Sequence, residues 1–142
     1  MKHTFPFLLA ALLLLAITSC SKSDDERGAS TAVATSLRSG TWRVTTYSDN
    51  GADETTDFNS FTFIFTNSGT VTATNSILTA NGTWSTGIDD SKHKLNLNFS
   101  SPAFFSEISE DWEIVSQSST QVSLRHVSGG SGEIDLLVFQ KN

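Results

Sequence analysis

Two histidines, His93 and His126, are the side chains best suited to acid–base or metal chemistry in the main part of this chain. Neither belongs to a nucleophile motif of the type G-x-S-x-G or a zinc motif of the type H-E-x-x-H. His93 stands between two lysines and is predicted to be a solvated turn residue. His126 falls on the same side of its predicted strand as Val122 and Leu124, so its side chain could point to the interior. Buried polar groups are nearly always hydrogen-bonded, and we expect the same of His126. We therefore expect no catalytic residue and no enzymatic activity.

A second group with chemical potential is the acidic loop Asp49–Glu54 together with Asp57, because carboxylates are the ligands that calcium prefers. The spacing does not match an EF-hand loop, since Gly51 comes before the second aspartate. The Asn50-Gly51 pair is typical of a tight turn between strands. The loop is therefore predicted to be solvated, and we expect neither a metal site nor a cofactor.

The only cysteine, Cys20, follows an apolar run from Phe5 to Ile17 that begins after the basic residue Lys2. The run is shorter than the roughly 20 residues that a membrane-spanning helix needs, and its order is that of a secretory signal. Ile17-Thr18-Ser19-Cys20 resembles the lipobox of bacterial lipoproteins. The resemblance implies that residues 1–19 are a signal peptide, and that Cys20 is acylated and anchors the protein to a membrane. A lone cysteine also excludes a disulfide within the chain.

Residues 20–36 are rich in Ser, Thr, Ala and charge, and Val33 is their only large apolar residue after Cys20. This composition predicts a flexible tether. Its acidic run, Ser23-Asp24-Asp25-Glu26, resembles the export signal of surface-exposed lipoproteins of the Bacteroidota; a solvated charge run is the other interpretation. We expect an outer-membrane location, with periplasmic or surface orientation left open.

The rest of the chain, residues 37–142, has the size of one domain. The net charge of the whole chain is −6, so a nucleic acid is not an expected partner. Apolar and polar residues alternate in eight short segments separated by turn residues, which predicts an all-β fold. The predicted strands are 41–47, 58–66, 70–74, 82–86, 94–99, 112–115, 121–127 and 133–140.

Eight sequential antiparallel strands can close into a small up-and-down barrel, which removes exposed edges. The alternation puts Trp42, Val44 and Thr46 on one face of the first strand, and aligns Ile134, Leu136 and Val138 in the last. A short helical cap is predicted at 103–110. The candidate interior or ligand-lining residues are Trp42, Phe61, Phe63, Phe65, Trp84, Leu97, Phe99, Trp112, Leu124 and His126.

Gly40-Thr41-Trp42 at the start of the first predicted strand resembles the G-x-W opening of the lipocalins, and 112–139 is similar to the later strands of lipocalin-like domains in Bacteroidota lipoproteins. The resemblance implies a lipocalin-like barrel in which the tryptophan closes one end. In lipocalins an arginine near the last strand covers this tryptophan, but here that segment offers only Lys141. Arg125 is a candidate substitute.

Two functions follow from these observations, and the sequence leaves both open. The first is a non-enzymatic lipoprotein that binds a small apolar or amphipathic ligand in the barrel. The second is a structural or interaction lipoprotein with a filled barrel and no small-molecule ligand. An eight-stranded barrel is wide enough either for its own side chains or for one small ligand. The many aromatic residues favour a filled interior.

Overall fold

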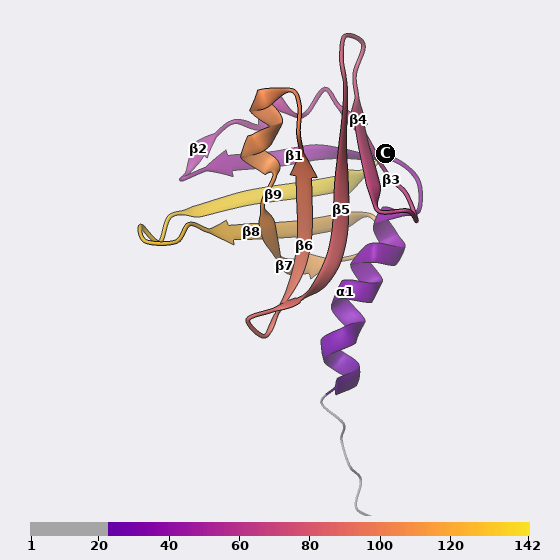
Figure 1. Ribbon diagram of the computed structural model, residues 1–142, viewed down its shortest axis with the longest axis vertical. Helices are drawn as coiled ribbons and strands as arrows, with labels where there is room; N and C mark the ends of the chain where they lie inside the picture. The colour runs from indigo at the N-terminus through magenta and orange to yellow at the C-terminus, as the bar shows by residue number, and fades with distance from the viewer. Residues whose placement is uncertain (1–22) are drawn as a thin grey trace, which may run out of the picture.

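A computed structural model describes the backbone of residues 23–142 and the side chains of residues 28–142 (Figure 1). The predicted signal peptide and Cys20 lie outside these residues, as do the side chains of Ser23, Asp24, Asp25 and Glu26. Within the described part of the chain, no helix combines the length and apolar composition needed to cross a membrane.

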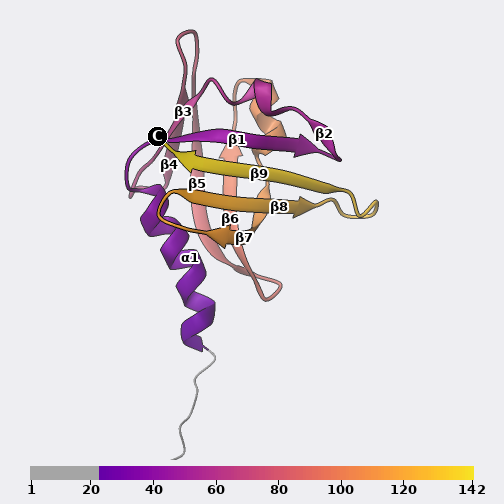
Figure 2. The same cartoon turned by 180° about the vertical axis from the view of Figure 1, so that it is seen from behind.

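The fold is a closed antiparallel barrel of eight strands, as the alternation predicts (Figures 1 and 2). Consecutive barrel strands pair with each other, and β1 pairs with β9 to close the ring. A short extra strand, β2, folds back on the end of β1. The strands are β1 Trp42–Asp49, β2 Ala52–Asp53, β3 Thr62–Phe65, β4 Thr70–Thr74, β5 Thr79–Asp89, β6 Lys92–Phe99, β7 Asp111–Gln117, β8 Gln121–Val127 and β9 Ile134–Lys141.

The residues of β1 that face the barrel interior are even-numbered at the start of the strand and odd-numbered after its middle. Trp42 and Val44 are buried as predicted, but the prediction for Thr46 is wrong, because it is exposed and Tyr47 is buried instead. The pairing of β1 with β9 shifts register between Val44 and Thr46. A bulge of this kind adds one residue to a strand and so turns the following side chains to the other face.

The predicted strand at 58–66 is shortened to β3. Residues before it form a 3-10 turn, η1 Thr55–Asp57, followed by a loop. Turn bonds run from the Phe58 N–H to the Thr55 carbonyl and from the Phe61 N–H to the Phe58 carbonyl. Phe58 and Phe61 are nevertheless buried, because this loop packs them over the barrel end.

The predicted helical cap is present as a 3-10 helix, η2 Ala103–Ile108. Phe105 and Ile108 are fully buried under it, whereas Phe104 is partly exposed. The Trp112 indole Nε1 donates a hydrogen bond to the Ile108 carbonyl at 3.0 Å. This bond joins the end of the cap to β7.

The expectation of a flexible tether is wrong for the residues next to the barrel. A helix, α1 Ser23–Leu37, packs against β5, β6 and β7 (Figure 1). Ser30, Val33, Ala34 and Leu37 are buried, and their spacing puts them on one face of a helix. The small, polar composition hides this face in the sequence, because only Val33 and Leu37 are large and apolar.

The three aligned residues of β9 share a face, and it is the outer one. Ile134 and Leu136 are exposed, while Leu137 and Phe139 fill the interior. The register pairs Leu137 with Leu124 across from β8. Both faces of this strand are apolar, so alternation alone does not identify the inner one.

Candidate functional site

Nine of the ten predicted interior residues are buried, with at most 5% of their surface exposed. The exception is His126, which is partly exposed and lies at one end of the barrel. The buried nine are Trp42, Phe61, Phe63, Phe65, Trp84, Leu97, Phe99, Trp112 and Leu124.

Aromatic rings occupy the barrel interior and contact one another. The Phe63 and Phe139 ring centres lie 5.1 Å apart, and the Phe65 ring lies 5.4 Å from Trp84. Phe105 of η2 reaches the Phe99 ring at 4.7 Å. These separations are those of rings in direct contact. Aromatic rings from β3, β5, β6, β9 and η2 therefore pack against one another inside the barrel.

β1 and β8 finish, and β9 begins, at the same end of the barrel (Figure 1). Several carboxylates lie close together there. They come from the end of β1, from η1 and the residue before it, from η2, from the start of β7 and the residue before it, and from the start of β9. We call this group the acidic rim; it consists of Asp49, Glu54, Asp57, Glu107, Glu110, Asp111 and Asp135.

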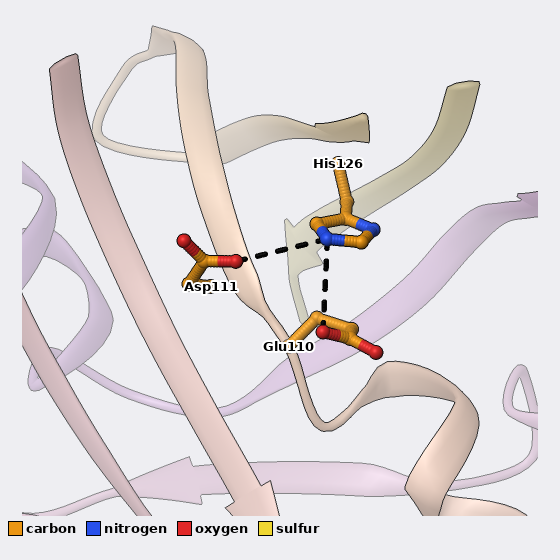
Figure 3. Close-up of side chains that lie close together, drawn as sticks. All are labelled: Glu110, Asp111 and His126. Carbon is orange, nitrogen blue, oxygen red and sulfur yellow. Dashed lines mark ion pairs between the residues drawn. The ribbon is translucent and has the colours of Figure 1, made fainter. Parts of the chain in front are cut away.

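His126 lies among three carboxylates of the acidic rim. Figure 3 shows two of them, Glu110 and Asp111, beside the imidazole. Its Nε2 is 3.7 Å from Glu110 Oε2 and 3.7 Å from Asp111 Oδ1. Its Nδ1 is 3.4 Å from Asp135 Oδ2. Glu110, Asp111 and His126 form a group whose ligand atoms all lie within 4.8 Å of one another, which is a spacing that a metal ion can bridge.

Neighbouring residues hold two of these carboxylates in place. Lys94 Nζ donates to Asp111 Oδ2 at 3.1 Å, so the other oxygen of Asp111 is left to face His126. Asp135 Oδ1 accepts a hydrogen bond from the Asn50 backbone N–H at 2.9 Å. The tight turn predicted at Asn50-Gly51 therefore positions Asp135 beside the imidazole.

A second group of carboxylates, Glu54, Asp57 and Glu107, lies at the same end of the barrel. Burial, followed by the negative charges of Glu54 and Asp57, raises the pKa of the Glu107 carboxyl above its usual value. The prediction of a solvated acidic loop agrees with the exposure of Asp57.

Tyr47 is buried beside the carboxylates of the acidic rim. Its hydroxyl donates to the Glu107 carbonyl at 3.2 Å. Burial and then the nearby Asp49 carboxylate raise the pKa of the Tyr47 phenol well above its usual value. The phenol therefore stays protonated and serves as a hydrogen-bond donor.

Arg125 does not cover Trp42, so the suggested substitution for the lipocalin arginine is wrong. It lies on the outer surface and binds Glu113 through Nε and Nη2, both at 3.0 Å. Arg125 is the register partner of Leu136 in β9, whereas Trp42 is the register partner of Lys141, five residues further along the same strand. Lys141 instead extends past Gly40 and donates to Ser39 Oγ at 3.1 Å.

His93 is not the isolated turn residue that its lysine neighbours suggest. It lies in β6, and its Nδ1 is 2.8 Å from Ser30 Oγ of α1. The same Ser30 hydroxyl lies 2.9 Å from the Gly87 carbonyl oxygen. His93 thus helps to attach α1 to the barrel.

No protein-family model matches the chain, and no curated protein sequence matches it. Among solved structures, it is similar to a DUF4847 family protein from Bacteroides vulgatus ATCC 8482, with a TM-score of 0.52 and 20% identity. The match covers 78% of this chain and 97% of that chain. This likeness establishes the fold alone. The barrel is therefore shared with a protein of the Bacteroidota.

Sequence patterns do not identify Glu110, Asp111 and Asp135 as neighbours of His126. One available signal was topological: in an antiparallel hairpin the start of β7 lies beside the end of β8. Glu110 and Asp111 stand at that start, and His126 stands near that end. No short motif records such a juxtaposition.

Proposed function

We propose that this protein is a membrane-anchored bacterial lipoprotein whose barrel is a non-enzymatic interaction module with no small-molecule ligand in its interior. The observation that carries the proposal is the contact between aromatic rings across the barrel, exemplified by Phe63 and Phe139 at 5.1 Å. Of the two functions that the sequence leaves open, the packed rings support the interaction lipoprotein.

Two hollows on the surface of the described residues also support a function of the outer surface. One, of about 280 Å³, is lined by Asn81, Gly82, Thr83, Asn98 and Ser100. The other, of about 230 Å³, lies among the charged residues of β6, β7 and β8. Neither lining includes an aromatic residue of the interior, and small-molecule sites usually have volumes of ~300 Å³ or more.

The outer face of β8 and β9 offers a surface on which a protein partner can bind. Val127, Ile134 and Leu136 are each between 43% and 48% exposed, and Val127 is the register partner of Ile134. Contiguous apolar side chains on an outer sheet face are typical of interaction sites. This row gives the proposed interaction a specific location.

The lipobox-like Ile17-Thr18-Ser19-Cys20 supports the membrane anchor, and Gly40-Thr41-Trp42 supports a lipocalin-like origin of the barrel. α1 is packed on the barrel from Ser30 onward. If Cys20 carries the lipid, only the short stretch before Ser30 separates barrel and membrane. The domain would then act close to the outer membrane.

Two measurements test the interaction module. An apolar fluorescent dye should not bind saturably to the purified protein, because rings fill the interior. A photo-reactive residue at Leu136 should cross-link to a specific protein in the producing cells, whereas the same residue at Asn98, on another outer face, should not. Saturable dye binding that Phe63→Ala abolishes would contradict the proposal, as would the absence of any Leu136 adduct.

The anchor is tested separately. Cys20→Ser should release the protein from the detergent phase, because the only attachment point for acyl chains is lost. Replacing Asp24, Asp25 and Glu26 by alanine should retain the anchor but protect the domain from protease on intact cells. Unchanged protease accessibility would reduce the acidic run to a solvated segment.

A further inference from the structure

We infer that Glu110, Asp111 and His126 bind a divalent transition-metal ion, and that Zn²⁺ is the ion that this donor set fits best. Figure 3 shows the three side chains turned toward one another. The site lies at the acidic rim, where Glu110 is exposed and Asp111 and His126 are partly exposed. It does not depend on the proposed interaction module, because its ligands are not part of the apolar row.

The positions of the donor atoms suit a metal ion better than direct bonds between the side chains. His126 Nε2 lies 3.7 Å from one oxygen of Glu110 and from one oxygen of Asp111. This separation is too long for a hydrogen bond. Zinc bonds to nitrogen and oxygen of about 2.0–2.2 Å put neighbouring ligands of a tetrahedral site about 3.4 Å apart. Each nitrogen–oxygen separation would therefore have to shorten by only a few tenths of an ångström, and the Glu110 and Asp111 oxygens, which lie within 4.8 Å of each other, would move to a similar separation.

The imidazole is oriented as a metal ligand. Asp135 lies on its Nδ1 side at 3.4 Å and is itself held by the Asn50 backbone N–H. Histidines that bind metals usually donate their second ring N–H to a carboxylate, which directs the other nitrogen at the ion. Within residues 28–142, no hydrogen bond is made by His126 Nε2, so that nitrogen is left for a ligand.

The charge balance at the site also favours a cation. Lys94 pairs with Asp111, but Glu110 has no lysine or arginine partner within residues 28–142. Asp135 adds a third carboxylate around the same imidazole. A concentration of negative charge at one end of the molecule attracts cations.

The mixed donor set distinguishes among cations. Calcium and magnesium prefer sites made of oxygen, whereas imidazole suits zinc and its neighbours in the first transition row. Three protein ligands leave a fourth position of a tetrahedral ion open for water or another group. We therefore expect Zn²⁺ to bind and Ca²⁺ not to compete with it.

The test measures Zn²⁺ affinity by competition with a chromophoric chelator near neutral pH. The full chain carries Cys20→Ser, so that the free thiol does not bind the metal. One Zn²⁺ per chain is expected. His126→Ala should reduce the affinity at least about 100-fold, and so should the double variant Glu110→Gln with Asp111→Asn. Asp135→Asn, which removes the partner of the imidazole, should reduce it about 10–100-fold.

Glu54→Gln with Asp57→Asn is the matched control, because it removes the same charge from the rim but leaves the three ligands. It should change the affinity by no more than about threefold, as expected for screened charges. His93→Gln should likewise retain binding. Circular dichroism of each variant without metal identifies any that fails to fold. The His126 ring nitrogen signals, followed by NMR, should shift on addition of Zn²⁺ while those of His93 do not.

Three results would overturn the inference. The first is that the chain does not bind Zn²⁺ at micromolar concentration. The second is equal loss of affinity in the control pair and in the Glu110 and Asp111 pair, which would show that only general negative charge attracts the ion. The third is an unchanged His126 signal in the presence of bound Zn²⁺.

Discussion

The indole Nε1 of Trp42 donates a hydrogen bond to the carbonyl oxygen of Leu37 at 3.0 Å, and both residues are fully buried. Leu37 is the last residue of α1, and the last carbonyls of a helix have no partner within the helix. Trp112 makes the equivalent bond to Ile108, the last residue of η2. Each tryptophan therefore attaches the end of one helix to the barrel.

Trp42→Phe should lower the free energy of unfolding by about 1–3 kcal/mol, because the buried Leu37 carbonyl loses its donor. Urea denaturation measures the loss, and hydrogen exchange should rise selectively in residues 28–37. Trp84→Phe is the comparison, since Trp84 Nε1 donates to the Thr66 carbonyl in a less buried position. Unchanged exchange in α1 of the Trp42 variant would show that this bond does not hold the helix.

Gly82→Ala should destabilise the barrel by about 1–3 kcal/mol, as overpacking usually does. A Cβ at this position would lie 2.5 Å from the Asn98 carbonyl oxygen and 2.7 Å from the Phe99 ring. Gly87→Ala in the same strand is the control, because nothing lies within 4 Å of a Cβ there. Equal midpoints for the two variants in urea denaturation would contradict this explanation.

Alternation predicts most of the barrel, because one face of most strands is apolar and the other is polar. It fails at Thr46, where a bulge changes parity, and in β9, where both faces are apolar. Pairing with neighbouring strands decides these positions, and a single strand does not contain that information. α1 is missed for a related reason: Ser30 and Ala34 become core residues only when the barrel lies against them.

The acidic rim shows a different limit of sequence reasoning. The parity of His126 makes it a candidate interior residue, but its carboxylate neighbours come from β9, from the start of β7 and from the residue before β7. Asp135 lies beside His126 because the two are register partners in the β8–β9 pair. Asp111 lies near His126 because β7 and β8 form a hairpin. Spacing motifs detect ligands that share a helix or loop, whereas this group assembles only when the barrel closes.

Phe63→Ala should lower the free energy of unfolding by about 3–5 kcal/mol, because a large ring packed against Phe105 and Phe139 leaves a cavity. Ile64→Ala is the matched control in the same strand, since Ile64 is 47% exposed and should lose less than about 1 kcal/mol. Urea denaturation compares the two. Similar small losses would mean that the interior is loosely packed and could accept a ligand.

The charged network on the outer surface predicts a pH dependence of stability. Glu113 accepts two hydrogen bonds from Arg125 at 3.0 Å and one from Lys92 at 3.1 Å. The Arg125 hydrogen bonds are the main cause that lowers the pKa of the Glu113 carboxyl to about 2, from an ordinary value of 4.5. Since the folded state favours the ionised carboxylate, its stabilisation is complete above pH 4.5 and is lost as the pH falls toward 2.

Glu113→Gln should therefore lower the melting temperature at neutral pH, through a loss of about 1 kcal/mol or less for a partly exposed network. The difference from wild type should shrink as the pH falls below 4.5 and should be largely lost by pH 2, where about half of the wild-type carboxyl is protonated. Asp89→Asn removes an exposed carboxylate of the same sheet and should show no such convergence. A difference between Glu113→Gln and wild type that persists unchanged at pH 2 would mean that packing, rather than the charge of Glu113, accounts for the effect.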